Sequence, residues 1–140
     1  MSDLDCLFER IAAGDIPSHR IYEDEHIYAF LDINPLSRGH AIVIPRKRYL
    51  TLDEVPDDVA AALGRALPRI AKAVIAATGA TAYNVLQNNG VSAGQAIPHV
   101  HFHIIPKYSD GSGLPHHWPA RPIDAQDAPR LARAIAQRLA

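Results

Sequence analysis

The residues that decide the fold of this chain are 98–106, PHVHFHIIP, in which three histidines alternate with apolar residues between two prolines. Successive side chains of a β-strand point to opposite faces of the sheet. The alternation therefore predicts a strand that carries His99, His101 and His103 on one face and packs its apolar residues on the other. Imidazole titrates near neutral pH, so such a row can attack, bind ligands or relay protons.

Outward from this run, the sequence has the patterns of four more strands and three helices. Strands are expected at 20–24, 27–31, 40–45 and 82–87, and helices at 6–13, 57–77 and 127–139. The segment 40–45 is almost entirely apolar, which is typical of a central strand. In the long helix apolar residues recur at steps of three and four, and Pro68 is expected to kink it.

Five strands mostly in hairpin order, with helices segregated to one side, indicate an α+β fold on a five-stranded antiparallel sheet. The length of 140 residues fits a single domain, 1–140. Fourteen basic and fifteen acidic residues give a net charge of -1, which argues against nucleic acid as a partner. No segment has the length of a membrane span or the pattern of a secretory signal, so no membrane association is expected. The single Cys6 excludes an internal disulfide and fits the reducing cytoplasm.

The three alternating histidines have three interpretations. They could be core residues, each satisfied by its own buried partner. They could bind a metal ion, but His99 and His103 would lie about 13 Å apart along a strand, so an ion would use two of them and a remote ligand. Alternatively, the central His101 could attack phosphorus as a neutral imidazole whose second nitrogen is held by a hydrogen bond. The turn 88–94 supplies amides and glycine N–H groups suited to an anion, and this favours His101 as the nucleophile.

Other short motifs accompany the histidine run. They are Asp32-Ile33-Asn34-Pro35, Gly39-His40, Val43-Ile44-Pro45, Asn88-Asn89-Gly90, Gly94-Gln95, and the opening segments 6–8 and 14–17. Together with the pattern His-φ-His-φ-His-φ-φ of residues 99–105, where φ is apolar, they resemble the histidine triad (HIT) family of nucleotide hydrolases and transferases. The resemblance covers residues 5–108 and is greatest to the bacterial HIT-like and purine nucleoside phosphoramidase type, and 109–140 form a C-terminal loop and helix.

The resemblance implies a HIT-like half-barrel that pairs into a homodimer with one continuous sheet. It also implies cleavage at the α-phosphorus of a purine nucleotide through a nucleotidyl-histidine on His101. The backbone or ring of His99 would hold the tautomer of His101, and His103 would contact the phosphate. His40 would support His99 from the neighbouring strand. This chemistry needs no metal and no cofactor.

The resemblance also implies a nucleotide-binding set. Asp32 matches the ribose position, and Ile33 and Phe8 would line the nucleoside pocket. Asn88, Gly94, Gln95 and Ala96 would surround the phosphate, and Trp118 matches a tryptophan that in some members reaches the partner subunit's site. Simpler structural roles stay open: Asp32 and Asn88 suit turns, and His40 could be a satisfied core residue.

The chain departs from the family pattern in two places. Many bacterial relatives build a structural zinc site from positions that are Cys6, Glu9 and Arg48 here; two ligands are therefore missing, and an ion pair between Glu9 and Arg48 is expected instead. Ala96 replaces a common Ser or Thr, which removes a hydroxyl near the leaving group.

The sequence therefore predicts a cytoplasmic hydrolase of nucleoside 5′-phosphoramidates. The alternatives are a dinucleoside polyphosphate hydrolase, a nucleotide-binding or scaffold protein with incidental hydrolysis, and a metal enzyme that uses two of the histidines.

Overall fold

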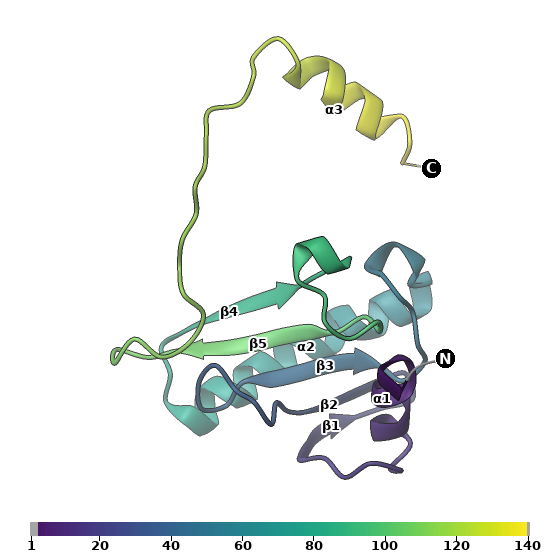
Figure 1. The fold of residues 1–140 in the computed structure, drawn as a ribbon, viewed down its shortest axis with the longest axis vertical. Coiled ribbons are helices and arrows are strands. Elements are labelled where there is room, and N and C mark those ends of the chain that lie inside the picture. Colours follow the sequence, from purple (N-terminus) through teal and green to yellow (C-terminus); the bar gives the residue numbers. More distant parts are fainter. Residues whose placement is uncertain (1–2, 140) are drawn as a thin grey trace.

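A computed structural model describes residues 3–139 as one five-stranded sheet with three α-helices (Figure 1). The elements are α1 (Asp3–Ala12), β1 (Arg20–Glu23), β2 (Ile27–Leu31), β3 (Ala41–Pro45), the 3-10 helix η1 (Leu52–Glu54), α2 (Asp57–Thr78), β4 (Ala82–Gln87), the 3-10 helix η2 (Val91–Ala93), β5 (Phe102–Lys107) and α3 (Ala128–Ala136). The strand order is β1-β2-β3-β5-β4, and all neighbouring strands are antiparallel. The predicted α+β class and the central position of the third strand are confirmed.

The main difference concerns the histidine run, because β5 begins only at Phe102. His99 and His101 lie in the irregular segment that leads into this strand. The backbone of this segment is hydrogen-bonded to the loop after β3, because the Val100 N–H donates to the Tyr49 carbonyl at 2.7 Å. Pro98 has no N–H to offer to a strand ladder, so regular pairing starts later than the alternation suggests.

The larger core lies between α2 and one face of the sheet. Alternate residues of the strands point to this face, because strand side chains have a period of two. Its buried members include Ile27, Ala29, Ala41, Val43 and Ile104 from the strands and Val59, Leu63, Ile70 and Val74 from α2. The helix continues without interruption through Pro68, and the expected kink stays a prediction.

A second, smaller core lies on the opposite face, against α1. Phe8 and Ile11 of this helix pack on Phe30 and Ile42 of the central strands. The helices are thus divided between the faces rather than gathered on one side: α2 covers one face, and α1 covers part of the other (Figure 1). The uncovered part of the α1 face is where the histidines lie.

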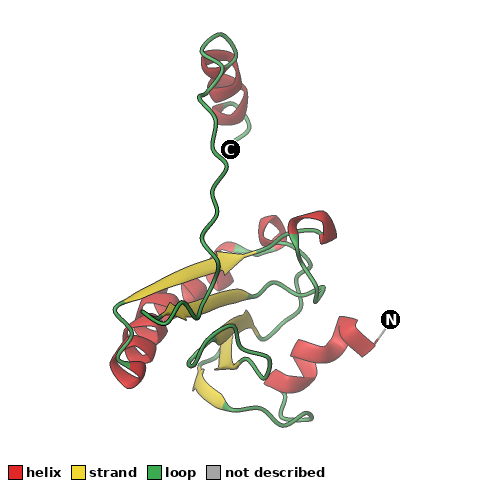
Figure 2. Ribbon diagram, turned by 60° about the vertical axis from the view of Figure 1, so that its left-hand side comes forward, coloured by secondary structure: helices red, strands yellow, loops and turns green. Residues whose placement is uncertain are grey.

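The C-terminal segment leaves the sheet after β5. Residues 114–123 have no regular secondary structure and lead to α3, which stands apart from the rest of the molecule (Figure 2). Within residues 3–139, no helix combines the length and the apolar character needed to cross a membrane.

A pair of glycine substitutions tests the packing at the end of α2. Gly39 has φ +91°, and an added Cβ would lie 2.6 Å from Thr78 Cγ2, while the Thr78 hydroxyl is tied to the Val74 carbonyl. Gly39→Ala should therefore lower the free energy of unfolding by about 1–3 kcal/mol. Gly64→Ala, inside α2 and with open space around the new Cβ, should instead raise it by about 0.5–1 kcal/mol. Urea denaturation measures both changes, and equal stability of the two variants would contradict the assignment.

Candidate active site

A pocket of about 490 Å³ opens on the face of the sheet opposite α2. Its volume is within the range of small-molecule sites. Of the predicted residues, Phe8, Asp32, Ile33, Gly94, Ala96, His101 and His103 line it. The sequence analysis missed most of the apolar wall, which includes Leu7, Ile11, Ile16, Phe30, Ile42 and Ile97. The alternation of β2 and β3 was the available signal, since Phe30 and Ile42 fall on the face away from α2.

His101 is held in one tautomer by a backbone group. Its Nδ1 lies 2.7 Å from the His99 carbonyl oxygen. A carbonyl can only accept, so Nδ1 carries the proton and Nε2 keeps its lone pair. The ring packs edge-on against Phe8, with centroids 5.1 Å apart, which fixes its plane. The orientation comes from the backbone of His99.

Burial also keeps His101 uncharged. Desolvation lowers its pKa below the ordinary value of 6.5, and the His99 carbonyl and the Asp32 carboxylate oppose this shift. The imidazole is therefore a neutral base at pH 7. A neutral ring with a free lone pair at Nε2 has the electronic state that a nucleophile needs.

A second chain of hydrogen bonds sets the tautomer of His103. The Leu36 N–H donates to His40 Nδ1 at 3.1 Å, so the proton of His40 is on Nε2. That atom lies 2.9 Å from His103 Nδ1 and 3.5 Å from an Asp32 carboxylate oxygen. With Nδ1 accepting, His103 carries its own proton on Nε2. Burial first, and then the neighbouring His101 and His40, lower the pKa of His103 to about 4.

The predicted support of His99 by His40 is therefore wrong, because His40 bonds His103. The strand register explains this, since Ile42 of β3 pairs with His103 of β5. His40 points to the same face as Ile42, two residues away, so His103 is its nearest histidine. His99 instead donates from Nε2 to the Pro45 carbonyl at 2.8 Å.

Two residues that were predicted to surround the phosphate, Gln95 and Asn88, do not line the pocket. Gln95 is buried; its Oε1 accepts from the Gly90 N–H, and its Nε2 donates to the Leu50 and Ile97 carbonyls. Its side chain braces the loop around η2 and does not line the pocket, which corrects the prediction of direct contact. Asn88 lies beside the same loop, with Nδ2 3.5 Å from the Gly94 carbonyl.

Trp118 lies on the C-terminal segment and is 80% exposed. It does not line the pocket of its own chain. Its predicted contact with a partner subunit stays a prediction.

The expected ion pair between Glu9 and Arg48 is not formed within residues 3–139. Arg48 Nε donates to the Pro98 carbonyl at 2.8 Å, and its guanidinium lies 3.8 Å from the Asp5 carboxylate. Through the bond to the Pro98 carbonyl, Arg48 fastens the segment that carries His99. Burial lowers the pKa of His99 most; the charge of Glu9 raises it and that of Arg48 lowers it.

Asp32, His40 and His103 place potential ligand atoms within 4.8 Å of one another, which is close enough to hold a metal ion. A histidine nitrogen binds a metal only when it is unprotonated. His40 Nε2 carries a proton because Nδ1 accepts from the Leu36 N–H. An ion would have to break that hydrogen bond, so the local bonding favours the histidine–histidine contact over coordination.

The geometry defines an open-sheet α+β protein with two oriented, neutral histidines at an apolar pocket. Comparison with known proteins identifies the group. The family model described as the HIT domain matches residues 13–110. The chain is 42% identical over 137 residues to "Protein hit" of Bacillus subtilis, covering 96% of this chain and 94% of that protein.

It is also 42% identical over 137 residues to adenosine 5′-monophosphoramidase HNT1 of Saccharomyces cerevisiae, covering 98% of this chain and 84% of that protein. A crystal structure of a HIT-family member from Bacillus subtilis matches with a TM-score of 0.91 at 40% identity, over 97% of this chain and 98% of that one. The chain belongs to the HIT family.

Acidification should destabilise the fold through its buried histidines. The pKa of His103 is about 4 in the folded chain, against an ordinary value of 6.5. Between these values the unfolded chain binds more protons, so the free energy of unfolding decreases as the pH falls from about 6.5 towards 4. Urea denaturation at about pH 7 and about pH 5 measures the loss. The variant His103→Gln should lose less stability than the wild type over this range; an equal loss would contradict the assignment.

Proposed function

We propose that the chain is a nucleotide hydrolase that cleaves nucleoside 5′-phosphoramidates at the α-phosphorus, through a nucleotidyl-histidine on His101. The observation that carries the proposal is the 2.7 Å hydrogen bond from His101 Nδ1 to the His99 carbonyl, in a ring that lines the pocket. This bond leaves the Nε2 lone pair facing a space large enough for a nucleoside. The name of the yeast relative, a monophosphoramidase, agrees with this substrate class.

In the first step His101 Nε2 attacks the phosphorus, and the bond from phosphorus to the leaving amine breaks. The amine takes a proton from solvent, and the ring becomes a phosphorylated imidazolium whose Nδ1–H still donates to the His99 carbonyl. In the second step water attacks the phosphorus, releases a proton and frees Nε2. The proton consumed in the first step is thus returned, and neither step needs a metal or a cofactor.

His103 stabilises the charge on the phosphate during both steps. Its tautomer, set by His40, presents an Nε2–H donor. Donors aimed at developing charge in a buried site contribute much of the rate of such reactions. The backbone N–H of Ala96, which lines the pocket, is the other proposed donor, since the Gly94 N–H already donates to the Val91 carbonyl at 2.9 Å.

The nucleoside lies along the apolar wall between Phe8 and Ile33, with Asp32 at the ribose hydroxyls. Asp32 Oδ1 accepts from the Asn34 N–H at 2.8 Å, so the same carboxylate forms the turn and fixes its own position. A carboxylate has further lone pairs and can accept from a ribose hydroxyl at the same time. The apolar wall supports binding of a purine without excluding other bases.

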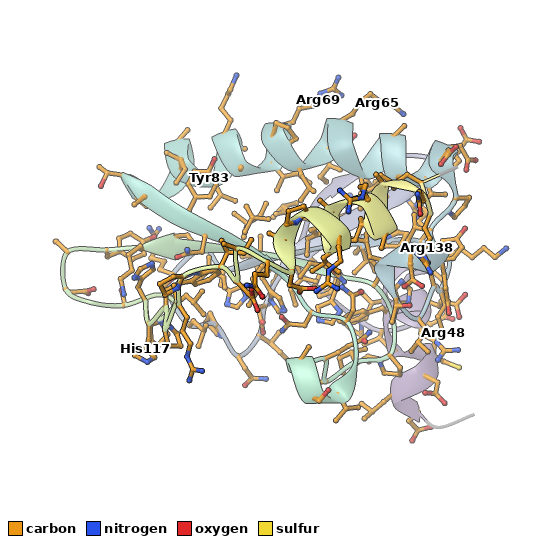
Figure 3. All side chains as sticks on the ribbon, turned by 90° about the horizontal axis from the view of Figure 1, so that it is seen from above. Arg48, Arg65, Arg69, Tyr83, His117 and Arg138 are labelled. Atoms are coloured by element: carbon orange, nitrogen blue, oxygen red, sulfur yellow. The ribbon has the colours of Figure 1, made fainter. Side chains whose placement is uncertain are left out.

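The proposed enzyme is a cytoplasmic homodimer. Strand β4 is at the edge of the sheet and carries Tyr83, which is labelled in Figure 3. Tyr83 and Val85 are 46% and 50% exposed. An exposed edge with apolar side chains supports pairing with a second copy, which would extend the sheet. The single Cys6 fits the reducing cytoplasm.

The substitution His101→Asn should abolish turnover while retaining nucleotide binding. It removes the attacking nitrogen, so the rate on an adenosine phosphoramidate should fall by several orders of magnitude, with little change in the Kd for AMP. His117→Asn, in the exposed C-terminal segment, is the matched control and should keep wild-type turnover. Acid quenching of the wild type during turnover should yield a protein heavier by one nucleoside monophosphate. Comparable turnover of His101→Asn would refute the mechanism, and dinucleoside polyphosphates assayed alongside would identify the preferred leaving group.

Ala96→Ser tests the leaving-group side of the pocket. Ala96 lines the pocket, so a serine there adds a hydroxyl donor near the departing group. The rate on alkyl phosphoramidates, whose amines leave poorly, should rise by roughly 10- to 1000-fold. Ala93→Ser, on the exposed side of η2, is the control. Unchanged turnover of Ala96→Ser on an alkyl substrate would count against this placement.

A further inference from the structure

The pocket runs across the strands of the sheet. His101 leads into β5, and Asp32 follows β2, which lies two strands away in the order β1-β2-β3-β5-β4 (Figure 1). Ser18 also lines the pocket and precedes β1, on the far side of β2. The Leu31 N–H donates to the His19 carbonyl at 3.0 Å, which places this segment beside the end of β2. Neighbouring strands are about 4.8 Å apart, so Ser18 lies three strand spacings, roughly 14 Å, from the histidines.

Ser18 lies at the end of the pocket that receives the base. A nucleoside with its α-phosphate at His101 and its ribose at Asp32 directs its base towards the segment before β1. The wall there is apolar, with Ile16 and Pro17 beside Ser18. The other polar side chains that the described residues contribute to the lining are those of Asp32, Asn34, His101 and His103. The first two follow β2 and the histidines lie with β5, so Ser18 is the polar group that faces the base.

The hydroxyl of Ser18 is paired with the hydroxyl of Tyr28 at 2.7 Å. Tyr28 is 6% exposed, and its ring contacts Phe30, with centroids 5.9 Å apart. The guanidinium of Arg46 lies over the same ring, with Cζ 5.7 Å from the centroid. Arg46 is itself fixed, because it donates to two backbone carbonyls and one carboxylate, those of Asp24, Ala12 and Glu23. The phenol therefore has a fixed position, and its hydroxyl holds that of Ser18.

This pair of hydroxyls keeps one hydrogen-bonding group available for a ligand. A buried phenol O–H needs an acceptor, and the Ser18 oxygen lies at hydrogen-bond distance, so Tyr28 donates and Ser18 accepts. A serine hydroxyl has one hydrogen and two lone pairs. After accepting from Tyr28, Ser18 still has one O–H donor and one lone pair. It can therefore donate to a carbonyl oxygen or accept from an amino group at the same place.

We propose that Ser18, held in place by Tyr28, binds the substituent at position 6 of a purine ring and so favours substituted purines over other bases. This inference rests on the proposed function and adds base selection to it. Adenine has an amino group at this position and guanine has a carbonyl oxygen, and the Ser18 hydroxyl can bond either one. A pyrimidine is shorter and does not extend from a ribose at Asp32 to Ser18. The pocket therefore accepts both common purines about equally.

The Kd values of four nucleotides test the contact without relying on turnover. They are AMP, GMP, UMP and purine riboside 5′-monophosphate, which has only a hydrogen at position 6. The wild type should bind AMP and GMP roughly 3- to 10-fold more tightly than the unsubstituted purine, as expected for one hydrogen bond. In Ser18→Ala the three purines should bind alike, and the Kd for UMP should stay unchanged. Ser112→Ala, which removes a hydroxyl bonded to Asp110 in the turn after β5, is the matched control. Wild-type ratios in Ser18→Ala would overturn the proposal.

Variants of Tyr28 separate base recognition from stability. Ser18→Ala leaves the Tyr28 hydroxyl buried without this partner, so it should lower the urea midpoint of unfolding. Adding Tyr28→Phe removes that hydroxyl and should restore the midpoint, but not the preference for substituted purines. Tyr28→Phe alone frees the Ser18 hydroxyl to rotate and should reduce the preference. Tyr22→Phe, which loses a 2.7 Å phenol bond to Asp24 on the α2 face, is the matched control and should keep it. A preference that returns with the midpoint in the double variant would contradict the contact.

The outcomes separate this proposal from the proposed function. A chain that binds AMP and hydrolyses its phosphoramidates, with the same base preference in the wild type and in Ser18→Ala, would keep the proposed function and overturn the contact with the base. A chain that neither binds these nucleotides nor hydrolyses their phosphoramidates would overturn both.

Discussion

The bond from His101 Nδ1 to the His99 carbonyl is the contact on which the site depends, because it determines which nitrogen of His101 is free. The bond is only as well placed as the backbone that offers the carbonyl. That backbone is held from the loop after β3, by the Tyr49 carbonyl that accepts from Val100 and by the Arg48 side chain on Pro98. A loop distant in sequence therefore controls the chemistry of the histidine segment.

The same principle governs the other histidines. A backbone N–H sets the tautomer of His40, which in turn sets that of His103. A backbone carbonyl fixes His99. Backbone groups cannot exchange donor and acceptor roles, so they define ring tautomers more firmly than other titratable side chains would. Burial completes the arrangement by lowering the pKa of His40, His99, His101 and His103, which keeps these four rings neutral.

One face of the sheet forms the main core, and the other forms the wall of the pocket. Alternate residues of β2 and β3 pack on α2 and form the main core, and the residues between them form the wall of the pocket with α1. The pocket is thus backed by the main core and by β3, which is buried along its whole length. A well-packed backing lets a mostly apolar site position a ligand with few polar contacts.

The sequence by itself determined most of the elements and several of the side chains that line the pocket. Alternation and helical periodicity are local properties, so they predicted β2, β3, β4 and α2 closely. The resemblance to the HIT family then assigned His101, Asp32 and Phe8 to one pocket, and all three line it. Only the tertiary structure decided which groups bond each other. The pairing of His40 with His103 follows from strand register, and the use of Gln95 and Arg48 as braces depends on backbone carbonyls that have no sequence signature. The late start of β5 and the isolation of α3 have the same origin, because the partners of a backbone group or an apolar stripe are fixed by how distant segments meet.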